Sequence, residues 1–281
     1  MNSFQKAPLI SVVVCSRVEG NENSNLIALL ESIQTMTCDP SVIEILIKFD
    51  DDDNLALQNI DRLSEFDFTI KYCTGKRLRG YIDIHHGYCQ AFEMASPTSI
   101  VVGALADDFT VIVKDWDKKI LEHSHHFPDN IFFIHQREHP RYCNTDMMQR
   151  NTDVPLSFDG STSESKCFLD WNFHQFPNLY IVDEAPFWGR AIIDATGGFG
   201  PVSFTDAWTL ALEHILWNQH HINRTIFMEE GLIQRTTGEM DQPSNIRWDT
   251  DRASNFDYIN SEEFSSIMEK EVQSILKYCL K

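Results

Sequence analysis

The sequence predicts an α/β fold: a mostly parallel central sheet with helices on both faces, followed by a less regular second half. Short apolar runs rich in β-branched residues alternate with helix-periodic segments over residues 8–115, as in repeated β-α-β units. These runs carry little charge, as expected of strands buried on both faces. Beyond residue 115 the alternation weakens, and residues 137–177 are polar with no clear period. Long loops of this kind tend to be binding segments or disordered.

The first half is expected to hold four strands joined by three helices. The helix after the first strand is predicted by Leu26, Leu29, Leu30 and Ile33, which fall on one helical face. The acidic run 50–53 precedes the next helix, where backbone N–H groups favour negative charge. The expected strands are 9–14, 42–49, 68–72 and 99–105, and the expected helices include 26–33, 54–63 and 84–94.

The second half allows fewer assignments. Thr205 can cap a helix that carries Trp208, and Asn260 with Glu263 resembles a capping box at the start of a C-terminal helix. A turn is expected at 197–201, and strands are expected at 130–135, 179–182, 222–228 and 232–234. We expect one domain over residues 1–240, divided near residue 115, and an extension over 241–281 that contains the last helix.

Composition and charge argue against several classes of protein. The formal net charge of −19 disfavours binding to nucleic acid or to an anionic membrane, because phosphate binding needs a basic surface. No stretch approaches the roughly 18 apolar residues that span a bilayer, and no signal-peptide pattern opens the chain. The seven cysteines are dispersed without a CxxC pair. They predict neither a zinc site nor a disulfide framework, and they favour the reducing cytoplasm.

Two adjacent carboxylates, Asp107 and Asp108, follow the apolar run 99–105 almost directly. Open α/β sheets bind their ligands outside the carboxyl ends of the strands. Neighbouring carboxylates there repel each other unless a cation or a donor-rich ligand shares the charge. A hard divalent ion that holds a phosphate satisfies this need. The pair therefore predicts a metal and phosphate site, and the alternative is that both aspartates cap the next turn.

Asp50 stands at the carboxyl end of the second expected strand, where it can accept hydrogen bonds from a base or a ribose. The alternative is an acidic helix cap exposed to solvent, and we favour that reading for residues 51–53. The chain has neither GxGxxG nor GxxxxGK[ST], so the usual dinucleotide and P-loop signals are absent.

Several segments resemble family 2 glycosyltransferases and occur in the order expected of that family. The resemblance covers roughly residues 8–235, and it rests on residues 8–17, 29–33, 45–51, 106–108, 187–191, 197–199 and 204–208. Ala106-Asp107-Asp108 resembles the short form of the family's DxD-type motif. The resemblance implies a GT-A fold, with a Rossmann-like nucleotide-sugar-binding half over 8–115 and an acceptor half over 116–240. It also implies a nucleotide-diphosphate sugar donor and a Mn²⁺ or Mg²⁺ ion.

The resemblance also implies roles for single residues. Ser16, Arg17 and Asp50 would line the nucleotide pocket. Asp107 would face the ribose or the metal, and Asp108 would bind the metal at the diphosphate. Asp206 would be the general base that takes a proton from the acceptor hydroxyl, as an inverting transfer requires.

The reserve carboxylates for the base are Asp183 and Glu184. A basic cluster of Lys76, Arg77 and Arg79 follows the third expected strand and can meet the diphosphate or an acidic acceptor. The alternative is a surface loop without a binding role.

The chain departs from the family pattern at three places. It has Thr205-Asp206 where the family usually has Glu-Asp. It has His85-His86 where members often carry an Arg-Asn pair, which puts the nucleotide contacts there in doubt. Many relatives place a metal-binding His in the late strand, whereas this chain has Gln234-Arg235. Arg235 can instead reach the diphosphate.

The leading hypothesis is a metal-dependent inverting glycosyltransferase that uses a UDP-sugar and a hydroxyl acceptor, such as a glycan. Two alternatives remain open. A nucleotidyltransferase of related fold is disfavoured because the loop after the first strand is not rich in glycine and basic residues. A catalytically silent nucleotide-sugar-binding protein would fit the departures at 205 and 234–235. Donor sugar, acceptor identity and oligomeric state are not predicted.

Overall fold

The computed structural model describes residues 7–19, 24–58, 60–78, 81–136, 187–200, 205–228, 231–235 and 261–279. Within these residues a mixed sheet of seven strands has the order β3-β2-β1-β4-β7-β6-β8, and β5 pairs with β9 in a small second sheet. The strands are β1 (Ile10–Ser16), β2 (Ile43–Asp50), β3 (Thr69–Gly75), β4 (Val101–Ala106), β5 (Phe109–Val111), β6 (Phe133–Gln136), β7 (Phe187–Gly189), β8 (Thr225–Met228) and β9 (Ile233–Arg235).

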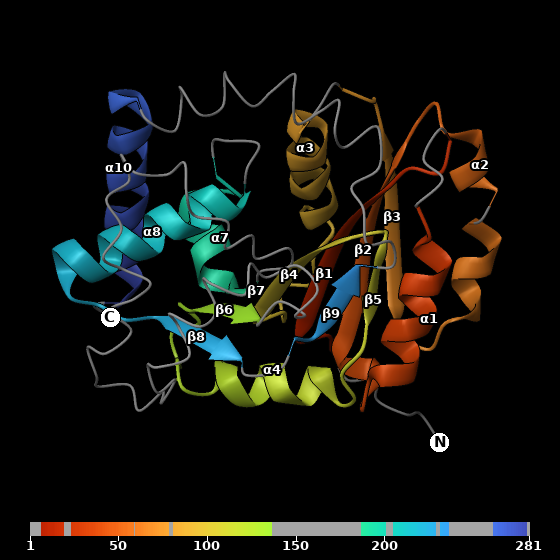
Figure 1. Cartoon of the computed structure of the whole chain (residues 1–281), viewed down its shortest axis with the longest axis horizontal. Helices are drawn as coiled ribbons and strands as arrows, with labels where there is room; N and C mark the ends of the chain where they lie inside the picture. Colours follow the sequence, from red (N-terminus) through yellow and green to blue (C-terminus); the bar gives the residue numbers. More distant parts are fainter. Residues whose placement is uncertain are drawn as a thin grey trace, which may run out of the picture.

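Helices lie on both faces of the large sheet (Figure 1). The described helices are α1 (Leu26–Met36), α2 (Asn54–Leu57), α3 (Tyr81–Phe92), α4 (Trp116–Ser124), α7 (Arg190–Thr196), α8 (Thr205–His220) and α10 (Glu262–Cys279), with 3₁₀ turns at Pro40–Val42 and Ile60–Glu65. None of these helices is long and apolar enough to cross a membrane.

Strands β1 to β4 form a continuous parallel block of the sheet, and β6 and β8 also pair in parallel. β1 lies between β2 and β4 and runs parallel to both, and β2 runs parallel to β3. Every residue of β2 is buried, which explains why its sequence is a nearly continuous apolar run. β7 is antiparallel to both β4 and β6, so it introduces the reversed direction into the sheet.

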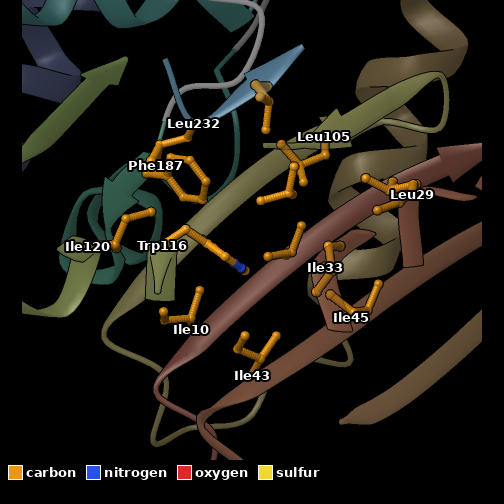
Figure 2. Close-up of a cluster of buried hydrophobic side chains, with 14 of the residues drawn as sticks. Ile10, Leu29, Ile33, Ile43, Ile45, Leu105, Trp116, Ile120, Phe187 and Leu232 are labelled. Atoms are coloured by element: carbon orange, nitrogen blue, oxygen red, sulfur yellow. The ribbon is translucent and has the colours of Figure 1, made fainter. Parts of the chain in front are cut away.

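Alternate residues of each strand face two separate apolar cores. Val12 and Val14 belong to the core beneath α1 and α4, whereas Val13 belongs to the core beneath α3, α7, α8 and α10. Figure 2 shows the first core, where the rings of Trp116 of α4 and Phe187 of β7 lie close together, with their centroids 6.1 Å apart. The period of two residues in a strand thus distributes the hydrophobic side chains between two helical layers.

The predicted α/β class and mostly parallel sheet are confirmed. The helix expected over 54–63 is instead the short α2 followed by a 3₁₀ turn at Ile60–Glu65. β5, α4, β7 and α7 were not expected. α4 begins after Asp115, which has a left-handed backbone and makes no side-chain cap, so its start carries no cap signal. The strand expected at 179–182 and the loop at 137–177 lie outside the described residues.

Candidate functional site

The carboxyl ends of three neighbouring parallel strands bring the predicted site residues to one edge of the sheet. In register, Ser16 of β1 lies opposite Phe49 of β2, and Cys15 lies opposite Ala106 of β4. Asp50 follows Phe49, and Asp107 follows Ala106. Residues far apart in the sequence therefore meet where open α/β sheets bind their ligands.

Asp107 is buried at this edge, with 7% of its surface exposed. One of its carboxylate oxygens, Oδ2, accepts hydrogen bonds from the Ser24 hydroxyl at 2.5 Å and from the Arg17 backbone N–H at 3.2 Å. Burial raises the pKa of Asp107 to about 6; the hydrogen bonds from the Ser24 hydroxyl and the Arg17 N–H lower it, and the neighbouring Asp108 raises it. Asp107 thus fastens the loop after β1 to the end of β4, and Asp108 is the more exposed of the two.

Asp50 is held between two cations. Lys48 Nζ lies 2.5 Å from Asp50 Oδ1, and Arg17 Nη1 lies 2.8 Å from Asp50 Oδ2. Lys48 also reaches Asp83 of α3 at 3.1 Å. Burial lowers the pKa of Lys48, but hydrogen bonds and charge from Asp50 and Asp83 outweigh it and leave the pKa raised. Because a carboxylate offers about four acceptor positions, Asp50 can still accept hydrogen bonds from a ligand.

Lys48 is not among the predicted site residues, although the sequence carries a signal for it. Lys48 stands two residues before Asp50 in β2, so both side chains face the same side of the sheet. A lysine inside an otherwise apolar strand must find a counter-charge, because an unpaired buried charge is costly. Its second partner, Asp83, lies on a helix that follows the next strand, and no local pattern indicates that contact.

The acidic run after β2 does more than cap a helix. Asp53 is the N-cap of α2 and accepts from the Ala56 N–H at 2.9 Å, as expected of a cap. It is fully buried, however, and not solvated as expected. Its carboxylate also accepts hydrogen bonds from the N–H groups of Val18 at 2.6 Å and Glu19 at 3.2 Å. Asp53 therefore holds the loop after β1 next to the site.

The basic loop begins at the same edge. Gly75, the last residue of β3, lies opposite Asp50 of β2. Lys76 and Arg77 follow it and are exposed, which agrees with a cationic segment beside the ligand edge. Arg79 lies outside the described residues.

His85 connects α3 to the second half of the chain. Its Nε2 lies 2.6 Å from the carbonyl oxygen of Gly200. Burial lowers the pKa of His85, against a raising effect of that hydrogen bond and a further lowering by His86. The position where family members often carry an Arg therefore holds a contact between the two halves.

The predicted base lies on α8. Asp206 is in the first turn of this helix, but its side chain is outside the described part of the structure, as are all of Asp183 and Glu184. Arg235 belongs to β9 and lies opposite Phe109 in the small second sheet. Arg235, at the late-strand position, is thus paired with Phe109, which directly follows Asp108. The Arg235 side chain lies outside the described part of the structure.

Trp188 and Trp208 are core residues. Both side chains are fully buried. Trp188 Nε1 donates to Thr209 Oγ1 at 2.9 Å, and Trp208 Nε1 donates to Glu271 Oε2 of α10 at 2.6 Å. A buried indole commonly finds such a partner for its N–H.

The raised pKa of Glu271 predicts how the stability of the fold depends on pH. Burial raises its pKa from the ordinary 4.5 to about 7, against the lowering effect of the Trp208 hydrogen bond. The folded state therefore holds more protons than the unfolded state between these values, and stability falls as pH rises through that window. Glu271→Gln imitates the protonated acid. We expect the variant to match the wild type near pH 4.5 and to be more stable above pH 7, by about 1–2 kcal/mol after solvent screening.

Urea unfolding of both proteins at several pH values measures this difference. Identical pH dependence in the wild type and the variant would contradict the raised pKa of Glu271.

The carboxylate pair is compatible with the implied metal ion. The described residues contain no group of three or more His, Cys, Asp or Glu side chains able to hold a metal. Mg²⁺ is usually bound by one or two carboxylates together with substrate phosphates and water, so a full protein cage is not required. Repulsion from Asp108, which adds to the larger effect of burial on the pKa of Asp107, is also what a shared cation would relieve. Asp107 and Asp108 therefore fit a site that is completed by a diphosphate.

No protein-family model and no curated protein sequence matches the chain. Solved structures do match it. The mannosyltransferase PcManGT from Pyrobaculum calidifontis, in complex with GDP-Man and Mn²⁺, superposes with a TM-score of 0.60 at 14% identity, over 98% of this chain and 74% of that one. TarS (1–349) from S. aureus in complex with UDP gives 0.53 at 10% identity, over 95% and 70%. The chain therefore has the GT-A fold of nucleotide-sugar glycosyltransferases, as the sequence predicted.

Proposed function

We propose that this protein is a metal-dependent inverting glycosyltransferase that moves a sugar from a nucleotide-diphosphate sugar, preferably a UDP-sugar, to an acceptor hydroxyl. One observation carries the proposal. Ser16, Asp50, Asp107 and Asp108 stand at the carboxyl ends of three adjacent parallel strands in a GT-A fold. Proteins of that fold are known in complex with GDP-Man and Mn²⁺ and with UDP.

The nucleotide would bind along this edge. Asp50 accepts hydrogen bonds from the base, and its position is set by Lys48 and Arg17. Ser16 and Arg17 line the pocket, and Arg79 meets the diphosphate. Asp107 faces the ribose or the metal, and Asp108 binds the metal at the diphosphate. Mn²⁺ or Mg²⁺ held by Asp108 and Asp107 would stabilise the negative charge of the departing diphosphate.

Asp206 is the base of the proposed transfer. It takes the proton from the acceptor hydroxyl while that oxygen attacks the anomeric carbon. A new carbon–oxygen bond forms as the bond from the sugar to the diphosphate breaks, so the configuration inverts. The position of Asp206 in the first turn of α8 favours the carboxylate form, because backbone N–H groups there carry partial positive charge. Acceptor choice would involve residues 137–177.

Calorimetry tests donor class and metal dependence together. We expect UDP to bind in the presence of Mn²⁺, with affinity well above that of GDP and CDP, and with strong loss of affinity when Mn²⁺ is replaced by EDTA. The physical reason is that a chain with a net charge of −19 needs a cation to accept a diphosphate.

No metal-dependent binding of any of the three nucleotides would contradict the proposed activity. Preference for GDP would contradict only the assignment of the donor nucleotide. Metal-dependent binding without turnover of any nucleotide sugar would favour the catalytically silent alternative, which the Gln234-Arg235 departure makes worth testing.

A further inference from the structure

The C-terminal helix α10 packs into the same apolar core as α8. Its buried residues Phe264, Met268, Val272 and Ile275 share this core with Trp208, and Figure 1 shows α7, α8 and α10 grouped at one end of the molecule. Residues 261–279 thus build the surroundings of α8, although they follow the segments that resemble a glycosyltransferase.

Glu271 is the acidic residue of α10 that turns toward this core. Its carboxylate accepts the hydrogen bond from Trp208 Nε1 at 2.6 Å. Glu269, by contrast, is exposed. An apolar side chain at position 271 would be enough to fill the core, whereas a half-buried carboxyl is costly unless it is hydrogen-bonded. Glu271 therefore adds a directional contact that hydrophobic packing alone does not supply.

The beginning of α8 needs such contacts. The first N–H groups of a helix have no partner within the helix, so this turn is held mainly by side chains. Two buried indoles hold it here. Trp188 donates to Thr209, whose hydroxyl in turn donates to the Thr205 carbonyl at 2.8 Å. Trp208 is held by Glu271.

Trp208 is also confined by the backbone at Gly200. A Cβ added to Gly200 would lie 2.4 Å from Cγ of the Trp208 ring, so the backbone at Gly200 packs directly on the indole. Gly200 has φ of +91°, which favours glycine, and its carbonyl contacts His85 of α3. The Trp208 ring is therefore held both by its packing on Gly200 and by its hydrogen bond to Glu271.

We propose that Glu271 is a positioning residue for sugar transfer: by accepting the Trp208 hydrogen bond, it fixes the first turn of α8 and thereby the place of Asp206. The inference rests on the proposed function, because it concerns the base of that reaction. Asp206 precedes Trp208 by two residues in the same turn. A displacement of about 1 Å at a reacting group can lower a rate about 100-fold.

Turnover of UDP-sugars tests the proposal. The readout is release of UDP, with water as acceptor, from the UDP-sugar that the wild type hydrolyses fastest in Mn²⁺. We expect Glu271→Leu to lower kcat about 10- to 100-fold, with the donor KM and the UDP Kd unchanged within about twofold. Glu271→Gln, which can still accept the hydrogen bond, should keep kcat within about threefold of the wild type. The control Glu269→Leu removes the same charge from an exposed site of α10 and should change nothing.

A double-mutant cycle tests whether Glu271 acts through Trp208. Trp208→Phe combined with Glu271→Leu should lower kcat no further than Glu271→Leu alone, because both changes remove the same hydrogen bond. Additive losses, full activity of Glu271→Leu, or equal impairment of Glu271→Gln would each overturn the proposal.

Hydrogen exchange separates this proposal from the proposed function. Glu271→Leu should speed amide exchange in a peptide spanning 205–216 and leave a peptide spanning 99–106 unchanged. If the wild type turns over no UDP-sugar, the proposed function fails, while faster exchange confined to 205–216 still supports the contact. Equal acceleration in both peptides indicates global destabilisation and overturns the positioning role.

Discussion

Asp108→Asn is expected to abolish Mn²⁺-dependent binding of UDP. The change removes the charge that would bind the metal while keeping the shape of the side chain, and an amide oxygen is a much weaker ligand for a hard cation. Residues that only hydrogen-bond to a metal ligand typically change metal affinity by 10- to 100-fold, so loss of a direct ligand should weaken binding by more than about 100-fold. Calorimetry with UDP and Mn²⁺ measures the effect.

The matched control is Asp61→Asn, which removes the same charge from an exposed residue in the 3₁₀ turn at Ile60–Glu65. Asp61→Asn should keep the wild-type affinity for UDP if charges far from the site do not affect binding. Unchanged UDP affinity in Asp108→Asn would refute the metal role of Asp108. Equal loss in both variants would instead indicate a general effect of net charge.

Asp206→Asn is expected to lower kcat for UDP release by about 10²- to 10⁴-fold, the range typical of a general base. The asparagine cannot take a proton, yet it keeps the size and hydrogen-bonding capacity of the side chain. Affinity for UDP with Mn²⁺ should stay within about twofold, since the base acts on the acceptor and not on the nucleotide.

Asp194→Asn serves as the control in the same half of the chain. Asp194 pairs with Arg190 on α7, and nearly half of its side chain, 46%, is exposed. It should keep the wild-type kcat. Loss of both turnover and UDP affinity in Asp206→Asn would show that Asp206 is structural, and full activity would remove it as the base.

The parallel strands could be predicted from local sequence because the pattern of each strand is recognisable within a few residues. β1, β2 and β4 are short β-branched runs, and polar residues mark their carboxyl ends. From these runs alone, Asp50 and Asp107 could be placed at the carboxyl ends of their strands, whereas Ser16 entered the predicted site through the family resemblance. Their spatial proximity follows from the parallel direction of the strands.

Contacts between distant segments could not be derived in this way. Trp208 and Glu271 are separated by 63 positions, and Lys48 and Asp83 by 35. β7 has three residues, too few to display a period of two. Asp53 looked like a simple cap because its contacts with Val18 and Glu19 appear only when β1 and β2 are side by side.

The anchoring of residues 17–19 would also affect the thermodynamics of the proposed nucleotide binding. Three successive backbone N–H groups, those of Arg17, Val18 and Glu19, are bonded to the carboxylates of Asp107 and Asp53. Folding, and not ligand capture, therefore bears the conformational entropy lost in this stretch, about 1–2 kcal/mol per residue. A preorganised loop leaves more of the contact energy available for affinity. A substitution of Asp53 that loosens this loop would therefore lower the affinity for a ligand that does not contact Asp53.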